Sequence, residues 1–287
     1  MGGKKLRKLI AEGELVVAPG AFSALTAKLV EEAGFNCVYM SGYCTAAFIY
    51  GYPDLGLVTM SEMLANARLL AEAVELPLIA DGDTGYGNPI NVVRTVREYE
   101  RAGAAALHIE DQVWPKRCGH MTGKQVVPKE EMTAKIRAAV DARASDDFVI
   151  IARTDAIGVE GLESAIDRLH AYAAAGADVV FADGQTNMEQ IERVPKECTE
   201  APCMINMGPL TPALSVADIQ KLGYAVAIFP AVCLGPAVLS VQDALRTFRG
   251  TGRTPALEGE ELIRLFGSFN KLMGADRYMA LDRKYKS

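Results

Sequence analysis

The chain lacks the cysteine pattern of a disulfide-stabilised or zinc-binding protein. Its 287 residues include six cysteines, at positions 37, 44, 118, 198, 203 and 233, and no two of them have C-x-x-C spacing. Disulfide scaffolds are small and rich in cysteine, and zinc sites place their ligands at short, regular spacings. The pattern therefore indicates thiols kept in a reducing compartment and predicts a cytoplasmic protein.

Long apolar segments and an excess of positive charge are also missing. Residues 1–7 are basic, but the apolar run of a signal peptide or a membrane span does not follow them. The net charge is −6 at pH 7, from 30 basic and 36 acidic residues, which argues against nucleic acid as a partner. An anionic substrate would have to be held by local positive groups or by a metal ion.

Short apolar runs alternate with helical patterns along most of the chain. The eight runs, each followed by a helical pattern, lie at 15–18, 37–40, 76–80, 105–109, 148–152, 179–182, 203–205 and 225–229. Continuous apolar strands separated by helices predict a parallel sheet covered by helices. Eight such units favour a closed (β/α)₈ TIM-type barrel, over residues 1–257, rather than an open doubly wound sheet.

Residues 258–287 are left over after the eighth unit and form a separate C-terminal extension. They carry an apolar stripe at helical spacing, made of Leu262, Leu265, Phe266, Phe269, Leu272 and Met273. A helix with such a stripe must bury it against another surface. Packing on its own barrel and docking on a second subunit are both compatible with the pattern.

Polar residues follow nearly every predicted strand, which is where a barrel of this type carries its chemistry. The residues at the predicted strand ends, polar except for Gly42 and Pro230, are Tyr39, Ser41, Gly42, Tyr43, Asp81, Asp83, His108, Glu110, Asp111, Arg153, Thr154, Asp155, Asp183, Asn206 and Pro230. Strand ends also lead into loops, which are polar for general reasons. His108 is compatible with orienting a metal-bound water or with a purely structural role.

Asp81 and Asp83 are the most informative of these residues. Side chains two residues apart on a strand point the same way, and two carboxylates that close repel each other unless a cation lies between them or one is protonated. Glu110 on the next strand, and Asp54 through a bound water, add hard oxygen ligands. Such ligands favour Mg²⁺, or alternatively Mn²⁺, over zinc. The alternative is that these acids pair with lysine or arginine.

The segment 110–121 brings a thiol next to this cluster. Cys118 is flanked by Lys116, Arg117 and His120, and neighbouring positive charge favours the thiolate. A cysteine that can give up and regain a proton near neutral pH is suited to general acid catalysis. A loop cysteine among surface charges is the alternative. Trp114 either lines the substrate pocket or anchors the loop.

Four motifs together resemble the isocitrate lyase/phosphoenolpyruvate mutase superfamily over almost the whole chain. They are Asp-Gly-Asp-Thr-Gly at 81–85, Glu-Asp-Gln-Val at 110–113, Lys-Arg-Cys-Gly-His at 116–120 and Ala-Arg-Thr-Asp at 152–155. The third motif is similar to that of the carbon–carbon lyase branch, which includes methylisocitrate lyases. Trp114-Pro115 before it looks like the 2,3-dimethylmalate lyase and petal death protein group.

The resemblance implies a barrel whose last helix is swapped between subunits of a homotetramer. It implies Mg²⁺ bound directly by Asp83, and by Asp54, Asp81 and Glu110 mostly through water. It further implies a small dicarboxylate substrate and assigns catalytic roles to Tyr39, as a phenolate base, and to Cys118. Residues implied to bind the substrate are Ser41, Gly42, Tyr43, Trp114, Gly119, His120, Arg153, Asn206 and Pro230.

Two departures from the family pattern fall at the far end of the pocket. Where relatives usually have a glutamate after the sixth strand, this chain has Asp183 followed by Gly184. The segment after the seventh strand, 206–212, has no glutamate and is about two residues shorter. Pro230 stands where oxaloacetate-hydrolysing relatives tend to have serine.

These features predict a carbon–carbon lyase that cleaves the C2–C3 bond of a malate-like 2-hydroxy dicarboxylate by retro-aldol chemistry. The predicted substrate is of the 2-alkylmalate, dimethylmalate or methylisocitrate type. One alternative is an oxaloacetate decarboxylase or hydrolase, which would use the same metal and oxo-acid site. A second is a barrel that binds a 2-oxo acid without catalysis, suggested by the missing glutamates.

Overall fold

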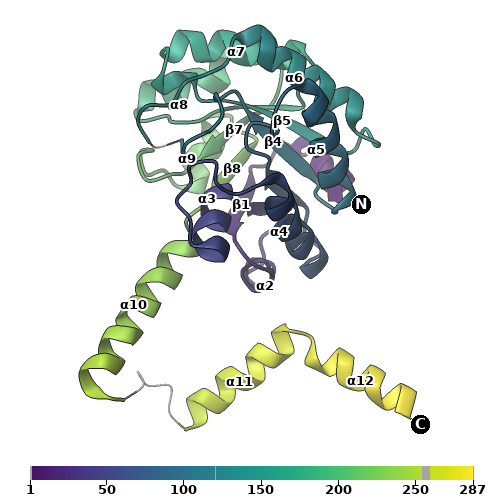
Figure 1. Ribbon diagram of the computed structural model, residues 1–287, viewed down its shortest axis with the longest axis vertical. Coiled ribbons are helices and arrows are strands. Elements are labelled where there is room, and N and C mark those ends of the chain that lie inside the picture. The colour runs from purple at the N-terminus through teal and green to yellow at the C-terminus, as the bar shows by residue number, and fades with distance from the viewer. Residues whose placement is uncertain (1, 120, 254–258, 287) are drawn as a thin grey trace. The chain divides into compact units, whose positions relative to one another are not determined.

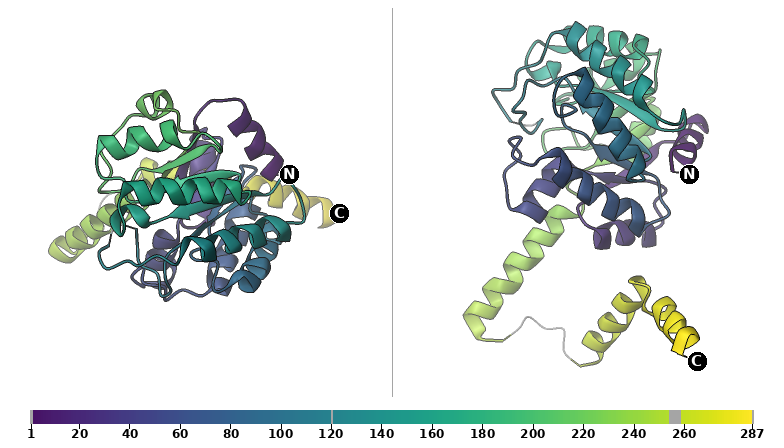
Figure 2. Two further views of the ribbon diagram at one scale, coloured as in Figure 1. Left: turned by 90° about the horizontal axis from the view of Figure 1, so that it is seen from above. Right: turned by 45° about the vertical axis from the view of Figure 1, so that its right-hand side comes forward.

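Eight parallel strands close into a barrel in the computed structural model, which describes residues 2–119, 121–253 and 259–286. Each strand pairs with the next, and β8 pairs with β1 (Figures 1 and 2). The strands are β1 (Val16–Ala21), β2 (Val38–Met40), β3 (Leu78–Asp81), β4 (Ala106–Glu110), β5 (Val149–Thr154), β6 (Val179–Ala182), β7 (Cys203–Asn206) and β8 (Val226–Phe229). The predicted (β/α)₈ fold is confirmed.

Helices follow the strands and cover the outside of the barrel (Figure 2). They are α2 (Ala24–Glu32), α3 (Gly42–Thr45) with η1 (Ala46–Tyr50), α4 (Met60–Ala73), α5 (Pro89–Arg101), α6 (Lys129–Ala142), η2 (Ala156–Gly158) with α7 (Leu162–Ala174), α8 (Met188–Glu197) and α9 (Val216–Lys221). Several of them begin at a capping residue. Thr59 before α4 and Asn88 before α5 both form a capping box, which satisfies backbone N–H groups that a helix start leaves unpaired.

The N-terminal helix α1 (Gly2–Ala11) was not predicted, because residues 1–7 drew attention only by their charge. Its apolar residues Leu6, Leu9 and Ile10 share one face, at the spacing of an amphipathic helix. Leu6 is fully buried and belongs to the same apolar cluster as the residues that fill the inside of the barrel, among them Tyr39 and Phe181. The helix therefore helps to close the barrel end opposite to the carboxyl ends of the strands.

The chain divides into two compact units, Met1–Leu234 and Gly235–Ser287. The second unit contains nearly all of α10 (Leu234–Thr251), together with α11 (Glu260–Leu272) and α12 (Ala275–Lys286). The predicted boundary between barrel and extension, after residue 257, lies within the second unit and stays a prediction. The described part of the extension, 259–286, forms two helices rather than one, divided at Gly274, whose φ of +78° lies in the left-handed region that glycine tolerates.

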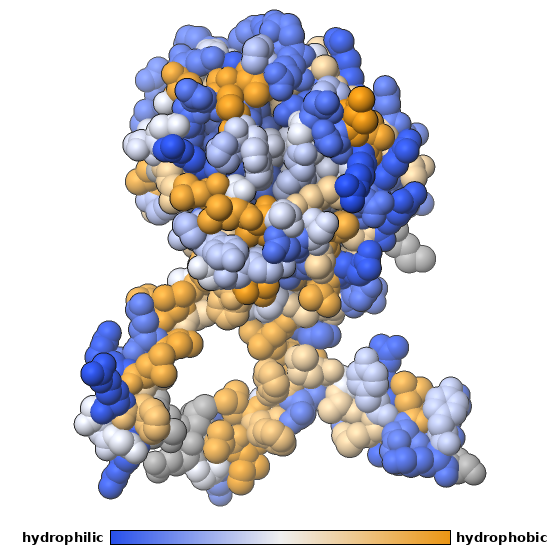
Figure 3. All heavy atoms as spheres, viewed as in Figure 1, coloured by the Kyte–Doolittle hydropathy of each residue, from blue (hydrophilic) through white to orange (hydrophobic). Residues whose placement is uncertain are grey.

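The apolar stripe of the extension is largely exposed on α11. Leu262 is 50% exposed, Phe266 70% and Phe269 42%. Apolar side chains also gather along α10, as the space-filling view shows (Figure 3). Among the helices within the described ranges, none has the length and apolarity needed to cross a membrane.

Candidate active site

The carboxyl ends of the strands bring the predicted polar residues to one mouth of the barrel. Strand pairing sets Asp81 beside His108 and Glu110 beside Arg153. All four side chains are buried, at 7% exposure or less. Because charged groups are costly to bury without partners, their contacts decide what this mouth can do.

Asp81 organises the acidic cluster. Its Oδ1 accepts a hydrogen bond from the backbone N–H of Asp83 at 3.0 Å, and its Oδ2 accepts one from the N–H of Gly42 at 2.9 Å. A Cβ on Gly42 would lie 2.7 Å from that Oδ2, so only glycine fits there. Asp83 itself has a φ of +46°, a left-handed conformation that is costly for a residue other than glycine and often marks a functional site.

Lys116 provides a cation inside the cluster. Its Nζ lies 2.6 Å from Oδ1 of Asp54 and 2.7 Å from Oδ1 of Asp83. Burial alone would lower the pKa of Lys116, but the two aspartates outweigh this effect and hold the pKa well above its usual value. The ammonium group therefore faces the acids, although the sequence pattern suggested that its charge serves the thiol of Cys118. The alternative in which these acids pair with lysine describes Asp54 and Asp83 in this state.

Arg153 lies between three carboxylates. Its Nε and Nη2 donate to Asp155 at 2.9 and 3.1 Å, and Nη2 also lies 2.6 Å from Oδ2 of Asp183. The third carboxylate is that of Glu110, 3.2 Å from Nη1. The arginine implied to hold a substrate carboxylate is thus firmly oriented at the mouth, and a bound acid would compete with Asp183 for it.

Buried acids outnumber buried cations at this mouth. Among the described residues, six carboxylates lie there, of Asp54, Asp81, Asp83, Glu110, Asp155 and Asp183, against the side chains of Lys116, Lys124 and Arg153. Burial raises the pKa of Asp83 to about 6 and that of Glu110 well above its usual value. Within the described residues, neither oxygen of Glu110 has a hydrogen-bond partner. The cluster would therefore gain from a further cation.

The donor set fits a hydrated ion rather than a cage made of protein ligands alone. The described part of the chain contains no group of three His, Cys, Asp or Glu side chains able to hold a metal ion together. Mg²⁺ usually keeps several waters and takes only one or two carboxylates directly. Asp83, with Asp54, Asp81 and Glu110 acting through waters, would satisfy that preference and would draw on the oxygens of Glu110, which accept no hydrogen bond from the described residues although Oε2 lies 3.2 Å from Arg153.

Tyr39 points into the barrel and pairs with His108. The phenol oxygen lies 2.9 Å from Nε2 of His108, which in turn lies 3.5 Å from Oδ1 of Asp81. Burial, reinforced by the charge of Asp81, raises the pKa of Tyr39 well above its usual value. Burial likewise lowers the pKa of His108. In this state Tyr39 is a neutral hydroxyl, and its phenolate form would need a nearby cation.

The segment after β2 lies against the end of β8. Ser41 caps α3 by accepting from the N–H of Cys44 at 3.3 Å, and the thiol of Cys44 donates to the carbonyl oxygen of Pro230 at 3.2 Å. Tyr43, on the same short helix, is 42% exposed. Four residues implied to bind the substrate, Ser41, Gly42, Tyr43 and Pro230, thus belong to one side of the mouth.

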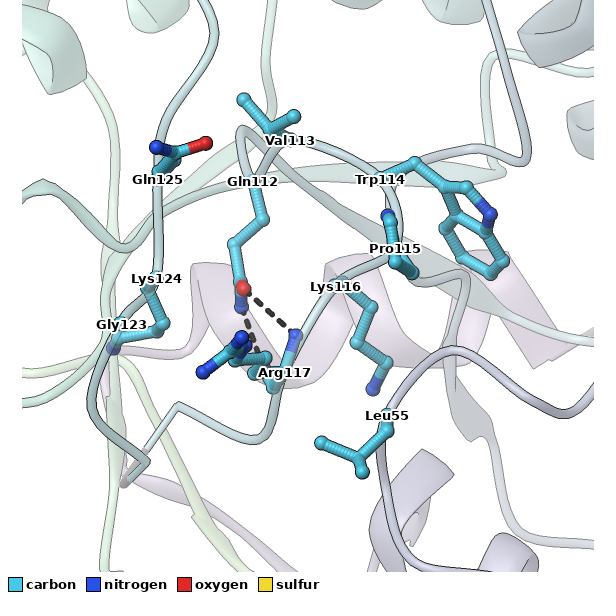
Figure 4. A pocket seen from close by; sticks show the side chains of 10 residues that line it. All are labelled: Leu55, Gln112, Val113, Trp114, Pro115, Lys116, Arg117, Gly123, Lys124 and Gln125. Atoms are coloured by element: carbon cyan, nitrogen blue, oxygen red, sulfur yellow. Dashed lines mark hydrogen bonds between the residues drawn. The ribbon is translucent and has the colours of Figure 1, made fainter.

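A flap, residues 112–126, rises from the end of β4. Its neck is closed by an antiparallel bridge between Gln112 and Val126 and by a hydrogen bond from the N–H of Val113 to the carbonyl of Gln125, at 2.8 Å. The side-chain amide of Gln112 braces the outgoing arm by pairing with both the carbonyl and the N–H of Arg117, at 2.8 and 3.0 Å. Figure 4 shows the two arms on either side of a pocket.

The flap is held down over the acidic cluster. The N–H of Cys118 donates to the carbonyl oxygen of Asp54 at 3.1 Å. Gly119 packs so tightly on the mouth that a Cβ there would lie 2.0 Å from Oδ2 of Asp183 and 2.8 Å from Nη2 of Arg153. The structure therefore brings Cys118 and Gly119 to the same mouth as the acids, whereas His120 lies outside the described residues.

Trp114 has the surroundings of an anchor. It is 45% exposed, its ring lies 6.3 Å from that of Tyr86, and a Cβ on Gly56 would lie 3.3 Å from its edge. These contacts support the alternative in which Trp114 fixes the flap to the barrel.

The two departures from the family pattern, at Asp183 and in the segment that begins at Asn206, lie side by side at the far end of the mouth. The side-chain amide of Asn206 donates to Oδ1 of Asp183 at 3.0 Å, while Oδ2 of Asp183 faces Arg153. The oxygen of the Asn206 amide is buried and has no partner among the described residues. It is therefore available to accept a hydrogen bond from a ligand.

Sequence reasoning missed a supporting network beneath Arg153. Asp111, fully buried, accepts hydrogen bonds from the hydroxyls of Thr154 and Tyr172, at 2.7 and 2.8 Å, and from the N–H of Asp155 at 2.9 Å. Arg168, one helical turn before Tyr172 on α7, completes it at 3.2 Å. The spacing of Arg168 and Tyr172 was the available signal, but their common acceptor could not be identified from it.

Comparison with known proteins identifies the group to which these features correspond. The family model described as phosphoenolpyruvate phosphomutase matches residues 6–249. The chain is 43% identical over 283 residues to 2,3-dimethylmalate lyase of Eubacterium barkeri, covering 98% of this chain and 97% of that protein. It is 42% identical over 252 residues to 2-methylisocitrate lyase of Aeropyrum pernix, covering 87% of this chain and 80% of that protein.

Solved structures give the same picture. A crystal structure of 2,3-dimethylmalate lyase, a PEP mutase/isocitrate lyase superfamily member, matches with a TM-score of 0.93 and 39% identity over 99% of this chain and 95% of that one. The structure of oxaloacetate acetylhydrolase in complex with 3,3-difluorooxalacetate matches with a TM-score of 0.93 and 38% identity, covering 100% of this chain and 97% of that one. The structure of phosphonopyruvate hydrolase complexed with oxalate and Mg²⁺ matches with a TM-score of 0.87 and 32% identity over the whole of both chains.

Proposed function

The chain belongs to the isocitrate lyase/phosphoenolpyruvate mutase superfamily, and from that premise we propose that it is a Mg²⁺-dependent carbon–carbon lyase. Its substrate is a malate-like 2-hydroxy dicarboxylate of the 2-alkylmalate, dimethylmalate or methylisocitrate type, cleaved between C2 and C3. The observation that carries the proposal is the position of Cys118, whose backbone is tied to Asp54 at the edge of the acidic cluster.

The proposed binding mode uses the fixed groups of the mouth. Arg153, oriented by Asp155, takes one carboxylate of the substrate by displacing Asp183, and the backbone around Ser41 and Gly42 takes the end with the 2-hydroxyl group. Mg²⁺, held by Asp83 and through water by the other acids, would supply Lewis acidity toward the oxygen on C2.

In the proposed reaction the substrate loses one proton to Tyr39 and gains one proton from Cys118. Tyr39, as the phenolate, takes the proton of the 2-hydroxyl group, and His108 holds the phenol oxygen in place through its contact at 2.9 Å. The C2–C3 bond then breaks, C2 becomes the carbonyl carbon of a 2-oxo acid, and the electron pair stays with the second fragment. Cys118 donates its proton to C3 of that fragment. The closed flap keeps water away from the carbanion.

Oxaloacetate hydrolysis is the second candidate, because the solved structure of oxaloacetate acetylhydrolase matches this chain closely. Both activities would need a divalent ion and a site for an oxo acid. Pro230 favours the lyase, since the relatives that hydrolyse oxaloacetate tend to have serine at that position. The carbonyl of Pro230 is already engaged by Cys44, and proline offers no hydroxyl group to a substrate.

A substrate panel separates these candidates. The purified protein with Mg²⁺ is expected to release a 2-oxo acid from at least one of 2,3-dimethylmalate, a 2-alkylmalate and 2-methylisocitrate, and to leave oxaloacetate at its spontaneous rate of loss. Release is measured with a 2-oxo-acid-specific dye or a coupled dehydrogenase. Acetate and oxalate formed from oxaloacetate would instead establish the hydrolase. Oxalate binding without cleavage of any compound would establish a binding protein.

We also propose that the protein assembles with further copies of itself, as a homotetramer, through its second unit. The exposed apolar residues of α11, such as Phe266 at 70% exposure, support this assembly because a stripe of that kind is costly in water. Light scattering after size exclusion is expected to give four times the chain mass. A Phe266→Glu variant is expected to give a smaller mass, whereas Lys271→Glu on the same helix should not; equal masses for all three would contradict the role of this face.

A further inference from the structure

Lys124 connects the flap to the barrel at a second point, separate from the hydrogen bond between Cys118 and Asp54. It lies on the returning arm of the flap, and its Nζ donates both to the carbonyl oxygen of Gly119 and to Oδ1 of Asp155, the latter at 2.9 Å. The side chains of Lys124 and Asp155 are only 6% and 0% exposed. One ammonium group thus joins the tip of the flap, its returning arm and the end of β5.

The barrel end of this connection is rigid. The N–H of Asp155 donates to the buried carboxylate of Asp111 at 2.9 Å, and the carboxylate of Asp155 receives two hydrogen bonds from Arg153. Burial alone would raise the pKa of Asp155, but Arg153 and Lys124 outweigh it and hold the pKa well below its usual value. Lys124 therefore meets a fixed, charged acceptor, and such charge-assisted bonds are stronger than neutral ones.

Two glycines, Gly184 and Gly119, lie beside the ammonium group of Lys124 between the flap and the barrel. Gly184, with a φ of +78°, follows Asp183, and a Cβ there would lie 3.8 Å from Nζ of Lys124. Gly119 rests directly on Asp183 and Arg153, and the ammonium group that binds its carbonyl oxygen also reaches Asp155 on the barrel. The closed position of the thiol and the position of this ammonium group are linked through a single residue, Gly119.

We propose that Lys124 is a positioning residue that holds the flap closed and thereby places Cys118 over the substrate. The inference rests on the proposed function, because the placement of the thiol matters for turnover only if Cys118 delivers a proton. The neck of the flap does not depend on Lys124, since the pairing of Val113 with Gln125 and of Val127 with Asp111 uses backbone groups alone. Loss of Lys124 should open the tip and leave the neck formed.

A buried ion pair is by itself weak evidence for any role beyond packing. The test must therefore measure how far the tip of the flap opens. In Lys124→Met, which keeps the length of the side chain but removes the ammonium group, hydrogen exchange is expected to quicken about 10-fold or more in peptides covering 117–122, and to stay unchanged at Val113 and Val127. The size follows from the loss of a hydrogen bond to a charged group. The measurement is exchange followed by mass spectrometry, with Lys124→Gln as a second neutral variant.

Lys129→Met is the matched control. Lys129 pairs with Asp167 at 2.5 Å on the surface, where the two side chains are 34% and 64% exposed, so exchange in the flap should not change. Lys124→Arg keeps the positive charge and should restore much of the protection. In the lyase assay, Lys124→Met is expected to lower kcat about 10-fold with a smaller change in KM.

Exchange that is the same in the flap tip of both neutral variants and the wild type would overturn the proposal, as would exchange that rises equally over the whole barrel. The exchange experiment needs no substrate. If no malate derivative is cleaved but the flap tip alone opens in Lys124→Met, the proposed function fails and the role of Lys124 as a tie stands. If cleavage is normal and kcat of Lys124→Met equals that of the wild type, the lyase stands and the positioning role fails.

Discussion

A Cys118→Ser variant is expected to lose about 10³-fold or more of kcat on the substrate of the lyase, because general acid catalysis contributes about 10²–10⁴-fold and a serine hydroxyl is a far weaker acid than a thiol. The substitution changes one atom on a flap whose backbone bonds, from Cys118 to Asp54 and from Met121 to Cys118, remain possible. Binding of Mg²⁺ and of oxalate should therefore persist. Steady-state kinetics and titration calorimetry measure the two quantities separately.

The control for this substitution is Cys198→Ser. Cys198 follows α8 and lies close to Cys203, whose thiol donates to its carbonyl at 3.5 Å, at the start of β7 and thus at the barrel end opposite to the mouth. It should lower the midpoint of thermal unfolding, because it buries a hydroxyl group among apolar side chains, and should leave kcat unchanged. Turnover that survives in Cys118→Ser would remove the thiol from the reaction and favour a proton supplied by another group of the mouth.

The barrel could be predicted from the sequence because its signals are local. An apolar strand followed by a helical pattern repeats eight times, and the rule that barrel chemistry lies at the carboxyl ends of strands then selects the mouth. Asp81, Glu110 and Arg153 were found in this way, and pairing of β3 with β4 and of β4 with β5 does bring them together. The helix α1 was missed because the basic residues of this segment were considered and the apolar face of Leu6, Leu9 and Ile10 was not.

The partners of the charged groups could not be predicted, because they depend on where the flap comes down. In the sequence Lys116 stands two residues from Cys118, which suggested an effect on the thiol, yet its side chain points to Asp54 and Asp83. Lys124 and Asp155 are 31 residues apart and meet only in the closed flap. Long-range contacts of this kind leave no periodic trace in the sequence.

Removal of the divalent ion, or of its principal ligand, is expected to abolish turnover as completely as loss of the thiol. An Asp83→Asn variant keeps the shape of the side chain and removes one negative charge from a cluster that holds more acids than cations. We expect its affinity for Mg²⁺ to fall about 100-fold, at the upper end for loss of a charged ligand contact. Wild-type protein treated with a chelator should likewise be inactive, and Mg²⁺ or Mn²⁺ should restore it.

Thermal unfolding tells a metal role from a structural one for Asp83. An ion present at about 100 times its dissociation constant stabilises the folded state by about 2.7 kcal/mol, which raises the Tm of a chain of this size by several degrees. Wild-type protein should show this rise with Mg²⁺, and so should the control Asp167→Asn, altered at a surface pair with Lys129. Asp83→Asn should not show it.

The change in the metal-free Tm of Asp83→Asn distinguishes the two roles more sharply than the rise in Tm with Mg²⁺ does. Burial raises the pKa of Asp83 to about 6, so its charge is unfavourable where it lies, even with Lys116 beside it. Neutralising the side chain should then leave the metal-free Tm equal or higher. A clear fall in the metal-free Tm, together with an undiminished rise on adding Mg²⁺, would mean that Asp83 serves only as the partner of Lys116 and that the ion is held by other residues.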